Sequence, residues 1–265
     1  MQLQGKTAFI TGASRGIGKG VARSYAAEGA TVVIASRSVD AGNQTAEEIN
    51  QDYPQGKAVF LETDVADRDQ LESRMDEVAR DIGDIGILVN NATPSGDSQP
   101  VRLENTGSDR IEYLATVNYL APVWAMQKLF PSMKANRWGR IISMCSLNGI
   151  NAHRYTVGYN GSKEALRALT RTAAAEWGGY GITCNIICPA AVTEPWKEYV
   201  ELVPDEAQKI LDMNPMGRLG DSERDIGPLA VFLASDAARY ITGNTIHADG
   251  GGHINGVPWF FDLPE

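Results

Sequence analysis

The stretch Thr7-Ala8-Phe9-Ile10-Thr11-Gly12-Ala13-Ser14-Arg15-Gly16-Ile17-Gly18 decides the fold of this 265-residue chain. An apolar, β-rich run is followed at once by glycines in the order G-x-x-x-G-x-G, and a helical pattern begins after them. Glycines at a strand-to-helix turn let the backbone approach a phosphate closely, and the free N–H groups of the helix favour an anion. The stretch therefore predicts a dinucleotide-binding unit, the alternative being a tight turn without a ligand.

Six further short apolar runs follow this first strand, and helix-period segments separate them. We expect strands at 7–11, 31–35, 58–61, 87–90, 140–144, 183–187 and 245–248. We expect crossover helices at 21–28, 41–51, 70–80, 111–134, 163–177 and 226–234. This alternation predicts an α/β, Rossmann-type, doubly wound parallel sheet of about seven strands in the order 3-2-1-4-5-6-7, with helices on both faces. The least regular stretches, 93–108 and 189–218, are candidate binding loops.

The bulk composition favours one domain over residues 1–265, because no Pro-, Gly- or Ser-rich linker divides the chain. A formal net charge of −9 argues against nucleic acid and anionic membranes as partners. The first residues lack a signal-peptide pattern and no apolar run reaches membrane-spanning length, so we expect a cytoplasmic protein. Cys145, Cys184 and Cys188 stand at apolar positions without nearby ligand patterns, which predicts buried free thiols and no metal site.

The second strand ends in Ala35-Ser36-Arg37. A dinucleotide fold that prefers NAD carries an acidic residue there, on the ribose 2′-hydroxyl. Arg37, with Arg15 from the glycine loop, can instead hold a 2′-phosphate through charge-assisted hydrogen bonds and stack on the adenine. We therefore expect NADP(H) in preference to NAD(H), the alternative being that Arg37 is an ordinary exposed arginine.

Tyr159 and Lys163 are four residues apart, so a helix places both side chains on one face. A phenol has a reference pKa of about 10, and a nearby ammonium or cationic nicotinamide favours the phenolate and lowers that pKa. The two side chains can therefore share one site. Tyr155 lacks a lysine four residues on, so we expect it to line a pocket or pack. His153 is expected to be a loop or interface histidine rather than a base.

Other short motifs follow the predicted strands in a fixed order. They are Asp64-Val65, Asn90-Asn91-Ala92, Asn118, Ser146, and Asp249-Gly250-Gly251, with further typical stretches at 217–220, 232–236 and 240–243. Together with the glycine loop and the Y-x-x-x-K pair, these motifs make residues 5–252 resemble the short-chain dehydrogenase/reductase family. The resemblance implies an NAD(P)(H)-dependent oxidoreductase that moves a hydride between the nicotinamide and a ketone, another carbonyl or a secondary alcohol.

The resemblance also implies a role for each matched position. Tyr159 would transfer the proton, Lys163 would bind the nicotinamide ribose, Ser146 would orient the substrate oxygen, and Asn118 would hold water in a proton relay toward the lysine. The implied cofactor contacts are Gly12, Ser14, Arg15, Gly16, Ile17, Gly18, Ser36, Arg37, Asp64, Val65, Asn91, Ala92, Tyr159, Lys163, Pro189, Ala190, Val192 and Thr193. The candidate substrate contacts are Thr93, Ser146, Asn148, Tyr155 and Trp196.

Three positions depart from the family pattern. Thr93 replaces the glycine that usually follows Asn-Asn-Ala, Ala190 replaces the glycine after Pro189, and Glu194 stands where a threonine usually contacts the carboxamide. Thr193 could substitute after a one-residue shift. These changes affect the carboxamide clamp and the substrate pocket, whereas the four implied catalytic residues are all present.

Aromatic and apolar residues in the predicted lid, 189–218, and in the C-terminal tail, 253–265, favour an apolar cyclic or aromatic substrate. Alternatively, the lid residues pack locally and the tail covers a neighbouring subunit. The resemblance implies a homotetramer or homodimer built by the helices at 111–134 and 158–178. A non-catalytic dinucleotide sensor and a redox-independent isomerase or eliminating enzyme are the competing functions. Retention of all four catalytic residue types weighs against the sensor.

Overall fold

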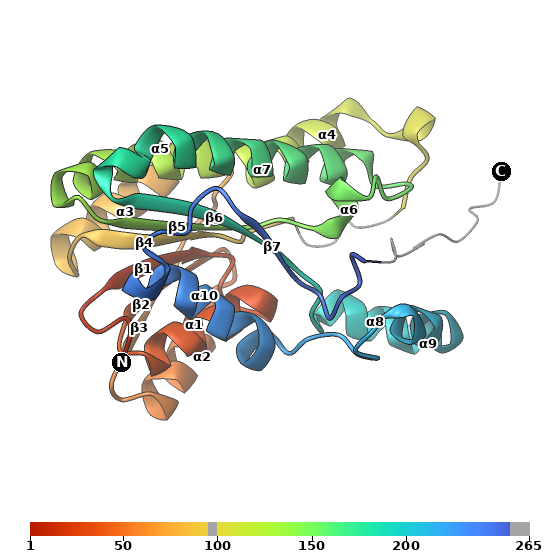
Figure 1. The fold of residues 1–265 in the computed structure, drawn as a ribbon, viewed down its shortest axis with the longest axis horizontal. Helices are drawn as coiled ribbons and strands as arrows, with labels where there is room; N and C mark the ends of the chain where they lie inside the picture. The colour runs from red at the N-terminus through yellow and green to blue at the C-terminus, as the bar shows by residue number, and fades with distance from the viewer. Residues whose placement is uncertain (95–99, 255–265) are drawn as a thin grey trace.

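A computed structural model describes residues 1–94 and 100–254 (Figure 1). Its centre is a parallel seven-stranded sheet in the order β3-β2-β1-β4-β5-β6-β7, which confirms the predicted topology. The strands are β1 (Thr7–Thr11), β2 (Thr31–Ser36), β3 (Lys57–Glu62), β4 (Ile85–Asn90), β5 (Gly139–Met144), β6 (Ile182–Pro189) and β7 (Thr245–Ala248).

The central strands are buried on both faces, as a parallel sheet between two helical layers requires. All five residues of β1 are buried, and Ile10 pairs with Ile34 of β2 on one side and with Val89 of β4 on the other. The chain order reverses between β1 and β4, which is the topological switch point of an open α/β sheet. The loops that follow these two strands therefore meet where such folds bind ligands.

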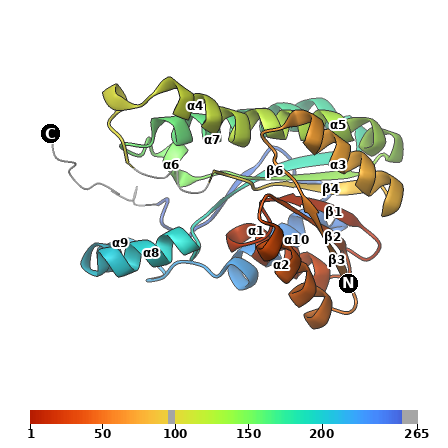
Figure 2. The ribbon, with the colours of Figure 1, turned by 180° about the vertical axis from the view of Figure 1, so that it is seen from behind.

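Two layers of helices cover the sheet (Figures 1 and 2). One face carries α1 (Gly16–Ala27), α2 (Val39–Asp52) and α10 (Gly227–Ala234), and the other carries α3 (Arg68–Asp81), α4 (Ser108–Ala115), α5 (Ala121–Asn136) and α7 (Val157–Trp177). Each layer closes its own apolar core, because every strand presents side chains to both faces. Tyr25, fully buried in the first core, donates its hydroxyl to the Ala230 carbonyl at 3.1 Å.

The helix predicted at 111–134 is not regular in the structure. It divides into α4, the π-helical turn η2 (Thr116–Leu120) and α5, and the three follow one another without a loop. A π-helical turn inserts one extra residue and often marks a functional site. Asn118 lies within this turn.

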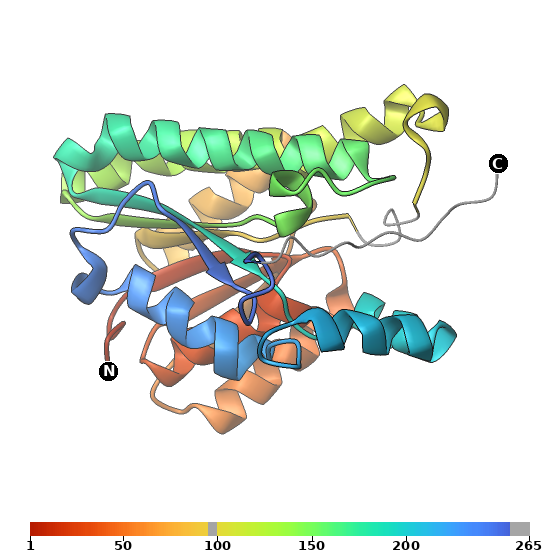
Figure 3. The same ribbon diagram turned by 45° about the vertical axis from the view of Figure 1, so that its right-hand side comes forward.

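The prediction that 189–218 is irregular is wrong, because this segment forms α8 (Glu194–Leu202) and α9 (Pro204–Met213). Both helices begin with proline in the first turn, where its missing N–H costs nothing. Figure 3 shows the two helices projecting from the body of the molecule, on the chain that leaves β6. The short helix α6 (Leu147–Ile150) follows β5 in the same region.

Cys145, Cys184 and Cys188 are buried and unbridged, as predicted. In the part of the chain that the structure describes, no helix combines the length and the apolar character needed to cross a bilayer. Residues 255–265 of the predicted tail lie outside the described residues.

Candidate active site

The glycine loop packs so closely on the chain after β4 that two of its positions exclude a side chain. A Cβ at Gly12, where φ is +67°, would lie 2.9 Å from the Ala92 Cα. A Cβ at Gly18 would lie 2.5 Å from the Asn91 Nδ2 and 2.6 Å from the Gly12 carbonyl oxygen. Real Cβ atoms do not make contacts this short, so glycine is required at both places.

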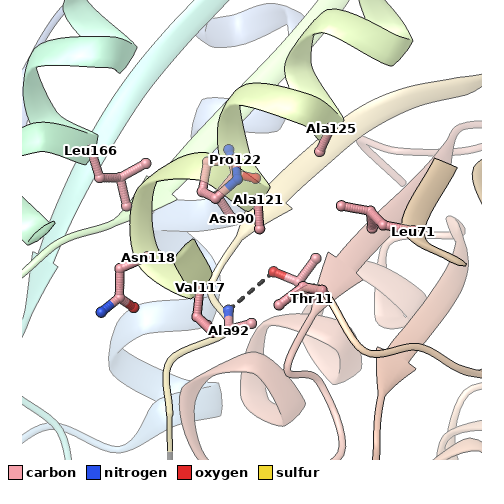
Figure 4. Close-up of a pocket in the computed structure, with 11 residues that line it drawn as sticks. Thr11, Leu71, Asn90, Ala92, Val117, Asn118, Ala121, Pro122, Ala125 and Leu166 are labelled. Atoms are coloured by element: carbon pink, nitrogen blue, oxygen red, sulfur yellow. Dashed lines mark hydrogen bonds between the residues drawn. The ribbon is translucent and has the colours of Figure 1, made fainter. Parts of the chain in front are cut away.

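The Thr11 hydroxyl joins the loops that follow β1 and β4 (Figure 4). It donates to the Val89 carbonyl at 3.2 Å and accepts the backbone N–H groups of Asn91 and Ala92, each at 3.0 Å. The Asn91 amide donates back to the carbonyls of Thr11 and Gly12, at 2.9 and 3.2 Å. These five bonds make the two loops one unit at the switch point.

The residues around this unit fit a bound dinucleotide. Helix α1 begins directly after Arg15 and has no acidic residue in its first turn, so its N-terminus is suited to an anionic ligand. At the end of β2, the Ser36 Oγ is buried and has no hydrogen-bond partner among the described residues. A ribose hydroxyl or phosphate at this place would satisfy it.

Arg37 is exposed beside Ser36 and reaches across to the other helical layer. Its Nη1 donates to the Tyr113 hydroxyl at 3.1 Å and lies 4.0 Å from the Asp64 Oδ2. Asp64 itself is held by its own turn, because its Oδ1 accepts the Ala66 N–H at 3.0 Å. Val65 is buried next to it. The structure thus places the predicted adenosine-side residues at one edge of the site.

Ser146, Tyr159 and Lys163 come together at the end of β5 and the start of α7. The Lys163 Nζ lies 5.6 Å from the centroid of the Tyr159 ring and donates to the Met144 carbonyl at 2.9 Å. Lys163 is 2% exposed, so that bond holds a buried amino group in place. A hydrogen bond with Ser146 favours ionisation of the Tyr159 phenol.

Burial dominates the pKa of Tyr159 and raises it to about 12, against the smaller lowering effect of Ser146. The pKa of Tyr159 therefore lies above that of a free phenol in the polypeptide by itself, because removal of the phenol from water disfavours the phenolate. Burial likewise lowers the pKa of Lys163. Both shifts favour the uncharged forms of the pair.

Asn118 is 1% exposed and is oriented by a partner that the sequence did not single out. Its Nδ2 donates to the Ser162 Oγ at 3.0 Å, and that hydroxyl donates to the Tyr159 carbonyl at 3.0 Å. Because the amide nitrogen is engaged, the Asn118 Oδ1 is the free end, and it has no partner among the described residues. The only signal for Ser162 was its place directly before Lys163.

A cavity of about 10 Å³ lies beneath the site, between η2, α5 and the ends of β1 and β4 (Figure 4). Thr11, Asn90, Ala92, Val117 and Asn118 contribute to its lining. A space of this size is comparable to one water molecule, so it cannot hold a nicotinamide or a substrate.

The candidate substrate residues are only partly brought together. Asn148 donates its backbone N–H to the Ser146 Oγ at 3.1 Å, and Thr93 is exposed after the β4 loop. The Trp196 ring lies 5.8 Å from that of Tyr199 on α8.

Tyr155, with φ of +67°, lines a separate cavity of about 600 Å³ that shares no lining residue with the catalytic set. His153 lines that cavity too, on the loop where it was expected.

The chain after β6 runs past the glycine loop. Ala190 donates its N–H to the Ala248 carbonyl at 3.0 Å, and Val192 donates to the Gly220 carbonyl at 2.8 Å. One Thr193 methyl carbon and one Glu194 carboxylate oxygen each lie 3.8 Å from the place that a Cβ on Gly16 would take. Thr193 and Glu194 are the two candidates for the residue that contacts the nicotinamide carboxamide, and both lie close to the turn at Gly16.

Comparison with known proteins agrees with this architecture. A family model described as enoyl-(acyl carrier protein) reductase matches residues 12–253. A 12α-hydroxysteroid dehydrogenase from a Clostridium species is 33% identical, with 93% of this chain and 96% of that protein covered. The 3-oxoacyl-[acyl-carrier-protein] reductase of Haemophilus influenzae is also 33% identical, over 96% of this chain and 100% of that protein.

A solved structure shows the same fold. YwfH, an NADPH-dependent reductase involved in bacilysin biosynthesis, superposes with a TM-score of 0.86 at 29% identity, covering 93% of this chain and 98% of that one. The parallel sheet with its glycine loop at the switch point, the ordered motifs and these full-length matches lead to one conclusion. The chain belongs to the short-chain dehydrogenase/reductase family of oxidoreductases, which act on CH–OH and C=O groups with NAD(P).

Proposed function

We propose that this protein interconverts a ketone and a secondary alcohol, with Tyr159 as the proton donor and acceptor. One observation carries the proposal. Tyr159, Lys163 and Ser146 meet at the same end of the sheet as the glycine loop. This arrangement supports proton transfer next to a bound dinucleotide.

Each side chain has a task that its surroundings support. When bound, the nicotinamide supplies or accepts the hydride. Ser146 orients the substrate oxygen toward the phenol of Tyr159, which donates its proton in reduction and accepts one in oxidation. The pKa of about 12 keeps that proton on Tyr159 near neutral pH, which suits the reductive direction. Lys163, held by the Met144 carbonyl, is the group that favours the phenolate when charged.

NADP(H) is the cofactor that we propose the site prefers. The support is the cation Arg37 next to the buried Ser36 hydroxyl, which has no hydrogen-bond partner among the described residues, with Arg15 exposed just before α1. Arginine binds phosphate through paired hydrogen bonds, which suits the 2′-phosphate of NADP(H). The structural relative YwfH is NADPH-dependent by name.

The cofactor preference is tested by measuring kcat/KM with NADPH and with NADH. The unmodified enzyme is expected to favour NADPH, and Arg37→Asp is expected to reverse the preference because a carboxylate repels the 2′-phosphate and accepts from the ribose hydroxyl. Arg68→Asp, on the exposed face of α3, is the matched charge control. Equal use of both cofactors by the unmodified enzyme would remove the argument.

We further propose an apolar cyclic or aromatic substrate bound under the segment 189–218. Trp196 and Tyr199 lie together on α8, and Val192 is 38% exposed just before it, so this segment offers an apolar surface next to the glycine loop. One relative is named for action on a hydroxysteroid, a rigid ring system. The lid role of 189–218, the two-fold assembly and the cytoplasmic location stay predictions.

Oxidation of NADPH and NADH, followed by absorbance against a panel of cyclic ketones and quinones, tests the activity. Tyr159→Phe is expected to lower kcat about 10²- to 10⁴-fold, which is the rate enhancement that a positioned general acid usually contributes. Tyr155→Phe is the matched control, because Tyr155 lines the other cavity. Cofactor binding without turnover of any substrate would favour the non-catalytic sensor instead. Turnover without net change in the nicotinamide would favour isomerisation.

A further inference from the structure

Glu194 is a departure from the family pattern that lies close to the glycine loop. One of its carboxylate oxygens lies 3.8 Å from the place that a Cβ on Gly16 would take. Gly16 is the first residue of α1 and lies in the glycine loop, where φ is +55°. The Glu194 carboxylate therefore lies close to the glycine loop, whose turn fits a pyrophosphate.

The local structure explains why a carboxylate is held there. Glu194 is the first residue of α8, so the dipole of its own helix stabilises the negative charge. Lys197, one turn further along α8, lies 3.7 Å from the other carboxylate oxygen. Helix α1 has no acidic residue in its first turn and no side-chain cap, so its N-terminal field also attracts the Glu194 carboxylate.

A pyrophosphate and this carboxylate compete for the same positive field. Both are anions, and like charges brought together in a binding site reduce affinity and discriminate among ligands. Thr193 and Glu194 stand side by side at Gly16, so a neutral hydroxyl is available next to the acidic group. The Thr193 side chain makes no capping hydrogen bond to the N-terminus of α8.

We propose that Glu194 sets the cofactor affinity of this protein by holding a negative charge at the phosphate-binding turn. This inference rests on the proposed function, because it requires a dinucleotide at the glycine loop.

The expected size of the effect follows from exposure. The side chains of Glu194 and Lys197 are 48% and 62% exposed, so water and salt screen the charge. Exposed charge pairs are worth little, and the corresponding change in a dissociation constant is about threefold to fivefold. The effect should diminish as ionic strength rises.

The experiment is titration of the protein with NADPH and with NADH, followed by protein fluorescence, at low and at high salt. Glu194→Gln and Glu194→Thr are expected to tighten binding about threefold to fivefold at low salt and less at high salt. Glu201→Gln is the matched control. It makes the same charge change on an exposed position of α8, about 10 Å further along the helix axis.

Adenosine and adenosine 2′-monophosphate serve as probes that lack the pyrophosphate, and their binding is expected to be the same in Glu194→Gln and wild type. The inference is overturned if wild type binds NADPH or NADH and Glu194→Gln gains no more affinity than Glu201→Gln. It is also overturned if the gain extends equally to the two adenosine probes. Failure of wild type to bind either dinucleotide would instead overturn the proposed function, and this inference with it.

Discussion

A single buried hydroxyl, on Thr11, makes three of the five hydrogen bonds that join the two loops of the expected cofactor site. Thr11→Val keeps the shape of the side chain but removes the acceptor for the N–H groups of Asn91 and Ala92. Unsatisfied buried N–H groups are costly, so we expect a loss of about 2 kcal/mol in the free energy of unfolding, together with weaker cofactor binding. Urea denaturation measures the first quantity and NADPH titration the second.

Thr11→Ser is the control for this substitution, because serine retains the hydroxyl and loses only a methyl group. It should stay within about 1 kcal/mol of wild type, in the range of small core truncations. Equal destabilisation by valine and serine would mean that packing of the methyl group, rather than the hydrogen bonds, maintains the junction.

The raised pKa of Tyr159 predicts opposite pH trends for the two directions of the reaction. Burial brings that pKa to about 12, so the phenol keeps its proton throughout the neutral range. Carbonyl reduction requires the proton and should show a flat kcat/KM from about pH 6 to pH 9, well below this pKa. Alcohol oxidation requires the phenolate, and its kcat/KM should rise with pH, by up to about tenfold per unit.

Parallel pH profiles in both directions, with the same substrate pair, check this prediction. The cationic oxidised nicotinamide favours the phenolate, so kcat/KM for oxidation should stop rising at a pH below 12. It should still increase with pH up to that point. An oxidation rate that falls as pH rises from neutrality would contradict the assignment of Tyr159.

At the scale of the element, two glycines in helices should respond to alanine in opposite ways. A Cβ at Gly18 in α1 would lie 2.5 Å from the Asn91 Nδ2, so Gly18→Ala must push the two loops apart and should abolish cofactor binding. A Cβ at Gly161 in α7 meets nothing within 4 Å. Gly161→Ala should stabilise the protein by about 0.5–1 kcal/mol, because alanine lowers the entropy cost of a helix.

Thermal unfolding and NADPH titration of both variants test the contrast. The stability of Gly161→Ala should rise while its NADPH affinity and kcat stay unchanged. If Gly18→Ala bound NADPH as wild type does, the close approach of α1 to the β4 loop would not be needed for the site.

The regular elements were the most predictable part of the fold. Every strand lies within two residues of its expected bounds at each end, because buried parallel strands are continuous apolar runs between helical segments. The start of α7 was placed six residues late, since Gly158 and Gly161 weaken the helical signal before Lys163. The helices of 189–218 were missed because their polar, proline-containing sequences resemble a loop.

The finer geometry of the site could not be predicted, for physical reasons. A π-helical turn changes hydrogen-bond spacing without changing residue type, so nothing in 111–134 marked Asn118 as lying in one. The pKa of Tyr159 depends on how fully the fold removes it from water, which spacing along a helix does not measure. The closeness of Glu194 to the turn at Gly16 joins residues distant in sequence and depends on the path of α8.

At the scale of the whole molecule, both helical layers expose apolar side chains. The layer with α4, η2, α5 and α7 carries Ile111 and Leu120, each 38% exposed, beside the helices that the family resemblance assigns to subunit contacts. Partly exposed leucine and isoleucine on one helical layer suit an interface between copies of the chain. On the opposite layer, α2 exposes Val39 at 43% and α10 exposes Phe232 at 37%.

This arrangement predicts that a charge at Leu120 separates the subunits, whereas a charge at Val39 does not. Burial of an unpaired carboxylate in an interface costs about 2–5 kcal/mol, so Leu120→Glu should raise the dissociation constant of the assembly at least about 30-fold. Val39→Glu adds the same charge to the other layer and should sediment as wild type does. Sedimentation equilibrium of the three proteins over a range of concentrations measures this.

A wild-type monomer at working concentration would contradict the expected dimer or tetramer. Dissociation by Val39→Glu would place the interface on the face formed by α1, α2 and α10 instead.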